Sequence, residues 1–312
     1  MNLSYGTFRG LDSVTMENSR TRVIYLKHFG GRMVSLVNLK TGREYLTTGA
    51  GDKHMIAGYG DNFNQCSDLS GVDEVFPTCN PCVYPFFPWE GHKVPPHGEL
   101  WTQNWDFDQK GDELIMTAHG IRFPYTFTKT VRLLDTGVLH IEYRIINYSA
   151  FDMHFLWMLH PLLCMEDDVT ITLPDGINKI ISMFSTTQEM GKGRIFDWPI
   201  AEVNGQKRDM SRSSGMEKLC AEKYFAYGKF DKGYMAITYE PSGEGLGVHF
   251  PADKVPYAGI WISNGRLRGI RHVALEACIG GRDELGKTIE EGESAILSAK
   301  GDYTFYLEYE LY

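Results

Sequence analysis

The stretch IRFPYTFTKTVRLLDTGVLHIEYRIIN, residues 121–147, alternates apolar and polar side chains on both sides of a central turn. The turn is Asp135-Thr136-Gly137, which combines residue types that tight turns favour. After the turn, apolar residues recur at every second position, at Leu139, Ile141, Tyr143 and Ile145. A period of two places these side chains on one face of an extended strand. The stretch therefore predicts a β-hairpin with one buried face.

The same alternation occurs on both sides of this hairpin. Residues 21–48 contain short apolar runs broken by Gly30-Gly31 and Thr41-Gly42, which predicts a meander of consecutive hairpins. In DYTFYLEYELY, residues 302–312, the apolar side of a strand carries Tyr303, Phe305, Leu307, Tyr309 and Leu311. The opposite side carries Thr304, Tyr306, Glu308 and Glu310, so we expect it to face water.

Several other short apolar runs are bounded by Gly, Pro, Asn or Asp and predict strands. They are Val169–Leu173, Gly233–Tyr239, Leu246–Phe250, Ala258–Ser263, His272–Cys278 and Ser294–Ala299. No long helical pattern competes with them. Many strands at close spacing, without alternating helices, indicate an all-β fold built as a large antiparallel β-sandwich. Since no linker or low-complexity tract interrupts the pattern, we expect residues 1–312 to form a single domain.

Two long stretches do not fit the strand pattern. Residues 58–106 and 184–220 are rich in Gly, Pro, Ser and Asn and are interpreted as loops. Loops of this length in a compact domain are usually functional or disordered. The first contains too many aromatic residues to be disordered, so it is a candidate for the functional region.

Composition narrows the classes of partner. The 312 residues carry a formal net charge of −9 without a basic run, which argues against nucleic acid as a ligand. The N-terminal residues show no signal peptide, and no span of eighteen apolar residues predicts a membrane helix. We therefore expect a cytoplasmic protein, with no nucleic acid and no membrane among its partners. The oligomeric state does not follow from the sequence.

The six cysteines are scattered, as in reduced cytosolic proteins, and are interpreted as free thiols. Cys79 and Cys82 form a C-x-x-C pair, but a structural zinc site needs four ligands and no second pair follows at a suitable spacing. Pro81 inside the pair disfavours the helix start that a redox motif needs. We predict neither a metal nor another cofactor.

Three segments carry candidate functional side chains. Residues 71–107 combine carboxylates, two histidines and three tryptophans in one loop-rich segment, and these groups suit the hydroxyls and C–H faces of a sugar. His160 ends an apolar run, where a lone histidine is often only a core residue. Glu276 lies in the middle of an apolar strand, where an unpaired charge would cost several kcal/mol. Such a carboxylate is either paired or functional.

The motifs HGELW (residues 97–101), LHPLL (159–163) and ALEACIGG (274–281) resemble, in order and spacing, three motifs of the galactose mutarotase (aldose 1-epimerase) superfamily. The resemblance spans nearly the whole chain and implies a galactose mutarotase-like supersandwich that binds a monosaccharide. It further implies that Glu276 is the general base on the anomeric hydroxyl and His160 the general acid on the ring oxygen. His97 would bind and polarise the same ring oxygen, and no cofactor would be needed.

The sequence departs from the family at the sugar-binding residues. Family members commonly carry an Asn-Arg pair before the first histidine, whereas this chain has GVDEVFPT at residues 71–78. We expect Asp73 and Glu74 to replace the pair. Two carboxylates that bind the sugar would favour a neutral or amino sugar. Glu222 is the candidate for a further substrate-binding carboxylate. Trp157 and Trp261 are candidate stacking platforms for the sugar.

Two other functions fit the same residues. A member of the fold could bind a sugar without turning it over, because function depends on sites rather than folds. Alternatively, Glu276 could pair with Asp73 or Glu74 in a β-sandwich hydrolase or lyase, which requires a carboxylate separation of about 5 to 10 Å. The mutarotase remains the leading hypothesis.

Overall fold

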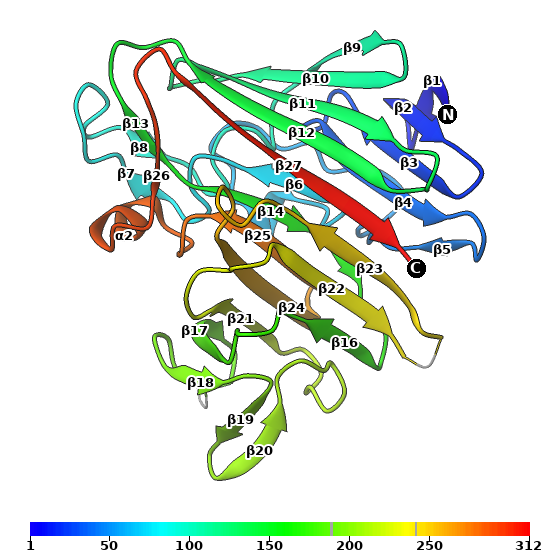
Figure 1. The fold of residues 1–312 in the computed structure, drawn as a ribbon, viewed down its shortest axis with the longest axis vertical. Helices are drawn as coiled ribbons and strands as arrows, with labels where there is room; N and C mark the ends of the chain where they lie inside the picture. The colour runs from blue at the N-terminus through cyan, green and yellow to red at the C-terminus, as the bar shows by residue number, and fades with distance from the viewer. Residues whose placement is uncertain (188–189, 241) are drawn as a thin grey trace.

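The computed structural model describes residues 1–187, 190–240 and 242–312. Within these residues two large antiparallel sheets pack against each other and make up most of the fold (Figure 1). This arrangement confirms the predicted all-β class and the large antiparallel β-sandwich.

The first sheet has 13 strands among the described residues, and the candidate site is built on it. In hydrogen-bonded order, its strands are β1 (Asn2–Phe8), β2 (Leu11–Glu17), β3 (Thr21–Leu26), β4 (Arg32–Asn38), β6 (Val72–Val75), β14 (Trp157–Pro161), β25 (Ile270–Ile279), β24 (Tyr257–Leu267), β21 (Ala221–Ala226), β17 (Lys179–Ser185) and β18 (Ile195–Asp197), with β5 (Arg43–Glu44) beside β4 and β15 (Leu163–Cys164) beside β25.

The second sheet has eight strands in the described part of the chain and backs the first. In order, these are β16 (Val169–Thr172), β22 (Tyr234–Tyr239), β23 (Glu244–His249), β27 (Asp302–Leu311), β12 (Leu139–Asn147), β11 (Tyr125–Leu133), β10 (Glu113–His119) and β9 (Asp106–Lys110). Strand β27, red in Figure 1, runs between β12 and β23 and joins the two halves of this sheet.

The remaining elements are small. Three two-stranded sheets pair β7 (Cys82–Val83) with β8 (Lys93–Val94), β13 (Met153–Phe155) with β26 (Ala295–Leu297), and β19 (Ile200–Val203) with β20 (Gln206–Asp209). The helices of the described residues are α1 (Phe63–Cys66) and α2 (Leu285–Glu290). With four and six residues, neither is long enough to cross a membrane.

The hairpin predicted from residues 121–147 is β11–β12. Val131 lies opposite Ile141, and Leu133 lies opposite Leu139. Buried and less buried residues alternate along both strands, because one face packs on the core and the other faces outward. Gly137, with φ of 94°, completes the turn in a conformation that favours glycine. The alternation predicted for β27 is also present, with Phe305, Leu307 and Tyr309 buried.

The six other predicted strands correspond to β16, β22, β23, β24, β25 and β26. The interpretation of residues 58–106 and 184–220 as loops needs correction, because β6 lies in the first stretch and β18, β19 and β20 lie in the second. These strands have three or four residues each, too few for a period of two to be visible. Residues 188–189 of the second stretch lie outside the described residues.

The main hydrophobic core contains residues from both sheets, such as Val75 and Leu275 from the first and Phe127 and Leu307 from the second. A smaller cluster lies on the opposite face of the first sheet and contains Phe63, Leu69, Trp101, Leu162 and Ala274. The central strands are consequently buried on both faces. The single domain over residues 1–312 stays a prediction, and the shared core is consistent with it.

Candidate functional site

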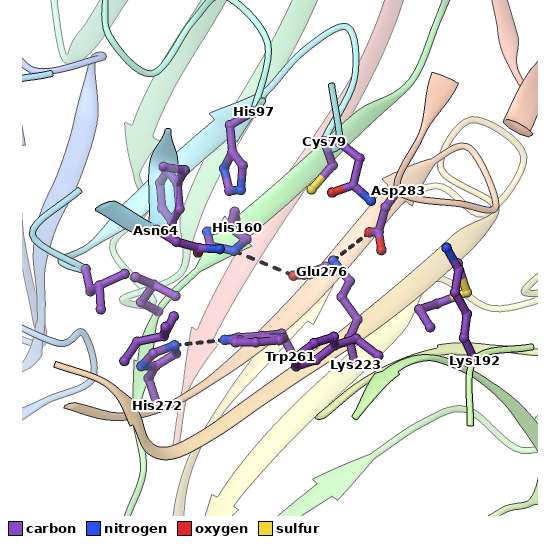
Figure 2. Close-up of a pocket in the computed structure, with 17 residues that line it drawn as sticks. Asn64, Cys79, His97, His160, Lys192, Lys223, Trp261, His272, Glu276 and Asp283 are labelled. Atoms are coloured by element: carbon purple, nitrogen blue, oxygen red, sulfur yellow. Dashed lines mark hydrogen bonds and ion pairs between the residues drawn. The ribbon is translucent and has the colours of Figure 1, made fainter. Parts of the chain in front are cut away.

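A cavity of about 370 Å³ lies on the face of the first sheet that points away from the main core (Figure 2). Its apolar lining includes Phe63, Leu69, Leu162, Phe184 and Trp261, several of which belong to or pack against the smaller cluster. Its ionisable lining groups include His97, His160, Lys223, His272, Glu276 and Asp283. Small-molecule sites commonly occupy about 300 to 1,000 Å³, so this cavity suits a ligand at the small end of that range.

Five neighbouring strands place the central polar groups in a row across the sheet. Asp73 of β6 lies opposite His160 of β14, and Glu276 of β25 lies opposite Gly259 of β24. Lys223 of β21 reaches Glu276 across β24, over the position that Gly259 leaves open. A Cβ atom at Gly259 would lie only 2.5 Å from Glu276 Oε2. The missing side chain at this position therefore makes room for the carboxylate.

Glu276 is fully buried and has two different neighbours for its two oxygens. Its Oε2 lies 2.6 Å from Lys223 Nζ, and its Oε1 lies 3.7 Å from His160 Nε2. Burial raises the pKa of Glu276 to about 7, against the opposing effect of the Lys223 charge. The sequence left this carboxylate either paired or functional, and the Lys223 contact shows that it is paired. Its Oε1 has no hydrogen-bond partner among the described residues.

The ring of His160 lies between two carboxylates. Its Nε2 faces Glu276, while its Nδ1 lies 3.9 Å from Asp73 Oδ2, too far for a hydrogen bond. Burial lowers the pKa of His160 well below its usual value, and the neighbouring His97 and Lys223 lower it further. His160 is therefore a neutral imidazole at neutral pH.

His97 is held rigidly beside His160. Its ring stacks on Phe63 with centroids 3.7 Å apart and lies 4.9 Å from the His160 ring. The backbone N–H of His97 donates to the Cys79 carbonyl at 2.7 Å. The following Gly98 has φ of 70°, and a Cβ there would lie 1.8 Å from the Phe76 carbonyl oxygen. The histidine-glycine sequence thus has a steric reason, and burial lowers the pKa of His97 to about 3.

The structure places Asp73 and Glu74 behind the cavity lining rather than in it. Asp73 is buried with its Oδ1 2.5 Å from Arg32 Nη2. Glu74 points to the opposite face of β6, where its carboxylate lies 3.2 Å from Lys129 Nζ and accepts a hydrogen bond from Trp157 Nε1. Because adjacent residues of a strand point to opposite faces, only one of the two could face the cavity. The expectation that Asp73 and Glu74 hold the sugar is therefore corrected. Glu74 also cannot form a catalytic carboxylate pair with Glu276, because it lies on the other face of the sheet.

Trp157 and Glu222 also lie outside the cavity. Trp157 is fully buried in the main core, 4.6 Å from the Phe305 ring. Glu222 forms a bidentate ion pair with Arg208, whose Nη1 and Nη2 donate to Oε1 and Oε2 at 2.7 and 2.9 Å. On β21 it is the next residue, Lys223, that faces the cavity. These positions correct the expectation that Trp157 and Glu222 contact a sugar.

Trp261 does line the cavity, as expected for a stacking platform. Its indole Nε1 donates to His272 Nε2 at 2.9 Å, which fixes the ring plane (Figure 2). Because Nε2 of His272 accepts this hydrogen bond, its proton resides on Nδ1. Burial lowers the pKa of His272 to about 4, which preserves this neutral form. Phe184, 5.9 Å from the Trp261 ring, extends the same aromatic surface.

Sequence analysis missed Lys223, Asp283 and His272. The alternation along CAEKYF could have indicated Lys223, because a buried lysine in a strand needs a carboxylate partner. Asp283 lies in the loop after β25 and is 2.7 Å from Lys223 Nζ. The backbone N–H groups of Cys79 and Asn80 donate to the Asp283 carbonyl, so two distant loops meet here. No local sequence signal reveals that contact.

Asp73, His97 and His160 form one group among the described residues that could hold a metal ion, with donor atoms within 4.8 Å of one another. The Arg32 guanidinium already supplies a positive charge to Asp73. Cys79 and Cys82 are free thiols; Cys79 lines the cavity and Cys82 lies in β7. The expectation that the protein uses no metal stays a prediction.

Comparisons with known proteins were made by sequence and by structure. No protein-family model matches the chain, and no curated protein sequence matches it. Among solved structures, a galactose mutarotase-like protein from Lactobacillus casei is 19% identical, with a TM-score of 0.68, and the match covers 96% of this chain and 100% of that one. The chain has the galactose mutarotase-like fold.

Other mutarotase-like structures agree with this assignment. A galactose mutarotase-like protein from Clostridium acetobutylicum is 11% identical with a TM-score of 0.68, and the match covers 99% of this chain and 98% of that one. A galactose mutarotase related enzyme from Lactobacillus acidophilus is 13% identical with a TM-score of 0.67, covering 96% of this chain and 97% of that one. At these identities the galactose mutarotase-like fold is shared along the whole chain, while activity must be argued from the site.

Proposed function

We propose that this protein is an aldose 1-epimerase, a mutarotase that interconverts the α and β anomers of an aldose. The observation that carries the proposal is the 3.7 Å separation of Glu276 Oε1 and His160 Nε2 in a cavity of monosaccharide size. Ring opening needs a base at the anomeric hydroxyl and an acid at the ring oxygen. Both oxygens are bonded to the anomeric carbon, so the two catalytic groups must lie close together.

The reaction proceeds by proton transfers alone. Glu276 Oε1 removes the proton of the anomeric hydroxyl, and the electrons of that O–H bond form the carbonyl. The bond between the anomeric carbon and the ring oxygen breaks, and the ring oxygen takes a proton from His160 Nε2. Rotation about the neighbouring carbon–carbon bond presents the other face of the aldehyde. Reversal of both transfers closes the ring as the other anomer.

The pair must hold one proton between its two members when the sugar binds. That proton resides on Glu276 below about pH 7, because burial raises the pKa of Glu276 to about 7 and lowers that of His160. For Glu276 to act as the base, the proton must pass to His160, 3.7 Å away. His97, whose ring lies 4.9 Å from that of His160, would donate a hydrogen bond to the ring oxygen, and Trp261 would contact the C–H groups of the sugar.

The proposed setting is the cytoplasm, with a free monosaccharide as substrate. All six cysteines are free thiols, as is usual in a reducing compartment. The lining combines carboxylate, imidazole and indole groups, which suit the hydroxyls and C–H faces of many aldoses. A panel of aldoses is therefore needed to define the substrate.

The proposal is tested by following the optical rotation of freshly dissolved α-D-glucose, α-D-galactose and other aldoses. We expect wild-type protein to accelerate the decay for at least one sugar, and Glu276→Gln not to do so. If folded wild-type protein accelerates none of them, the mutarotase proposal fails. Thermal stabilisation by a sugar in that case would favour a carbohydrate-binding protein without catalysis.

A further inference from the structure

The buried ammonium group of Lys223 has no role in the reaction described so far. Lys223 lies on β21, two strands away from Glu276, and its Nζ reaches the cavity across Gly259. Around Nζ lie Glu276 Oε2 at 2.6 Å, Asp283 Oδ1 at 2.7 Å and Met158 Sδ at 3.7 Å. The ammonium group thus forms close ion pairs with two carboxylates.

We infer that Lys223, anchored by Asp283, is a positioning residue that fixes the Glu276 carboxylate so that Oε1 is the oxygen that accepts the proton from the sugar. The inference rests on the proposed function. Oε2 forms an ion pair with Lys223 Nζ at 2.6 Å, whereas Oε1 faces His160 Nε2 at 3.7 Å. Because Lys223 Nζ lies against both carboxylates, its assigned role is to hold Glu276 rather than to bind the sugar.

The same ion pair favours the productive distribution of the shared proton. A positive charge 2.6 Å from Glu276 stabilises its ionised form and therefore favours the arrangement in which His160 carries the proton. Asp283 acts in the opposite direction, because its negative charge disfavours ionisation of Glu276. Lys223 and Asp283 together thus determine whether the shared proton resides on Glu276 or on His160.

Several ionisable groups among the described residues surround Glu276. Cys278 follows it on β25, and burial together with the Glu276 charge raises the pKa of the Cys278 thiol well above its usual value. His160 approaches from β14, Lys223 from β21, and Asp283 from the loop that follows β25. Cys79, in the loop after β6, also lines this part of the cavity, but burial raises the pKa of its thiol and keeps it neutral. Across β24, Gly259 contributes no charge. The effect of each substitution can therefore be assigned a sign.

The experiment compares the pH dependence of kcat/KM for wild type, Lys223→Met, Lys223→Arg and Asp283→Asn. Loss of the Lys223 charge should lower the maximal kcat/KM at least about 10-fold and move the alkaline limb to higher pH by about one unit or more. Asp283→Asn should move the alkaline limb to lower pH. The negative charge that raises the pKa of Glu276 is then gone, while the Lys223 charge that lowers this pKa remains. Lys223→Arg should keep the limb near its wild-type position. Lys207→Met, an exposed lysine of β20, is the matched control and should behave as wild type.

A second measurement separates this inference from the proposed function. The titration of Glu276 is followed by NMR of protein labelled with ¹³C at the glutamate δ-carbon, with Glu276→Gln for assignment. Lys223→Met should raise the midpoint of that titration, and Asp283→Asn should lower it. If both variants titrate as wild type, the inference is overturned even when the protein is an active mutarotase. If wild type is inactive with all sugars but the midpoints shift, the proposed function fails, while the control of the Glu276 pKa by Lys223 and Asp283 is upheld.

Discussion

At the scale of single residues, the site depends on how two buried side chains share one proton. Glu276 and His160 come from neighbouring strands, and neither has a direct hydrogen bond to the other. A sugar that binds between them would supply the missing hydrogen-bonding groups. In the proposed reaction, catalysis and binding therefore depend on the same two atoms, Oε1 of Glu276 and Nε2 of His160.

Removal of either group should abolish catalysis with little effect on folding. We expect Glu276→Gln and His160→Ala each to lower kcat/KM by about 10²- to 10⁴-fold, the usual contribution of a general acid or base. The thermal midpoint should stay close to that of wild type, because Lys223 keeps its contact with Asp283. Polarimetry and thermal denaturation of the same preparations check this. A loss of stability in proportion to the loss of activity would contradict a catalytic role.

The pH dependence of the reaction follows from the pKa directions of the pair. Burial raises the pKa of Glu276 to about 7, so the proton that the pair needs is present below this pH and lost above it. The pKa of His160 is lowered, so the second proton that would block the base is bound only in more acidic solution. We expect kcat/KM to decrease as pH rises through about 7. A rate that increases through this range would exclude the assignment.

Sequence reasoning located the central groups of the site but not their surroundings. Glu276, His160, His97 and Trp261 all line the cavity, because each lies in a motif or aromatic pattern that is visible locally. Whether they have the proposed roles remains a prediction. The search for a further carboxylate on β21 selected Glu222, although the cavity-facing residue is Lys223. To decide which of these two adjacent residues faces the cavity, one must know which face of β21 the second sheet covers.

At the scale of elements, the two faces of the first sheet have different functions. Trp157 and Trp261 lie on strands of the same sheet, yet one packs in the main core and the other lines the cavity. Composition alone does not separate them. The distinction arises from the period of two along each strand, which sends alternate side chains to the core and to the site.

These two tryptophans allow a matched test of the faces. Trp261→Ala should raise the KM for the sugar about tenfold, which corresponds to about 1.4 kcal/mol, with a smaller change in kcat. Trp157→Phe should leave KM unchanged but destabilise the fold by about 1 to 3 kcal/mol, because Glu74 loses the hydrogen bond from the indole. Steady-state polarimetry and urea denaturation distinguish these results. Equal effects of both substitutions on KM would contradict the assignment of faces.

At the scale of the whole molecule, the strands themselves were easier to predict than the order in which they pair within the sheets. Alternation identified the β11–β12 hairpin and β27, since each has a buried face and an outward face over nine or ten residues. It did not indicate that β27 lies between β12 and β23, because a pairing across more than 150 residues leaves no local pattern. The strand β6, which carries Asp73, was missed for a different reason: its four residues are too few to show a period of two.

The second sheet supports the site only through the shared core, so core packing should affect stability without affecting binding. Leu307 of β27 is fully buried in that core. We expect Leu307→Ala to lower the free energy of unfolding by about 2 to 5 kcal/mol, the usual cost of such a cavity. KM should stay unchanged at temperatures where the variant is folded. Denaturant unfolding and polarimetry check both parts, and a raised KM would show that the two sheets are coupled.

The central place of β27 also bears on synthesis at the ribosome. Every other described strand is translated before residues 302–311, yet β12 and β23 can acquire this shared neighbour only when those residues emerge. Until then the nascent chain holds two half-sheets with open edges, and unpaired edges are prone to pair with other chains. The yield of folded protein should therefore depend on how long translation pauses before this strand, and on chaperones that shield the two edges during the pause.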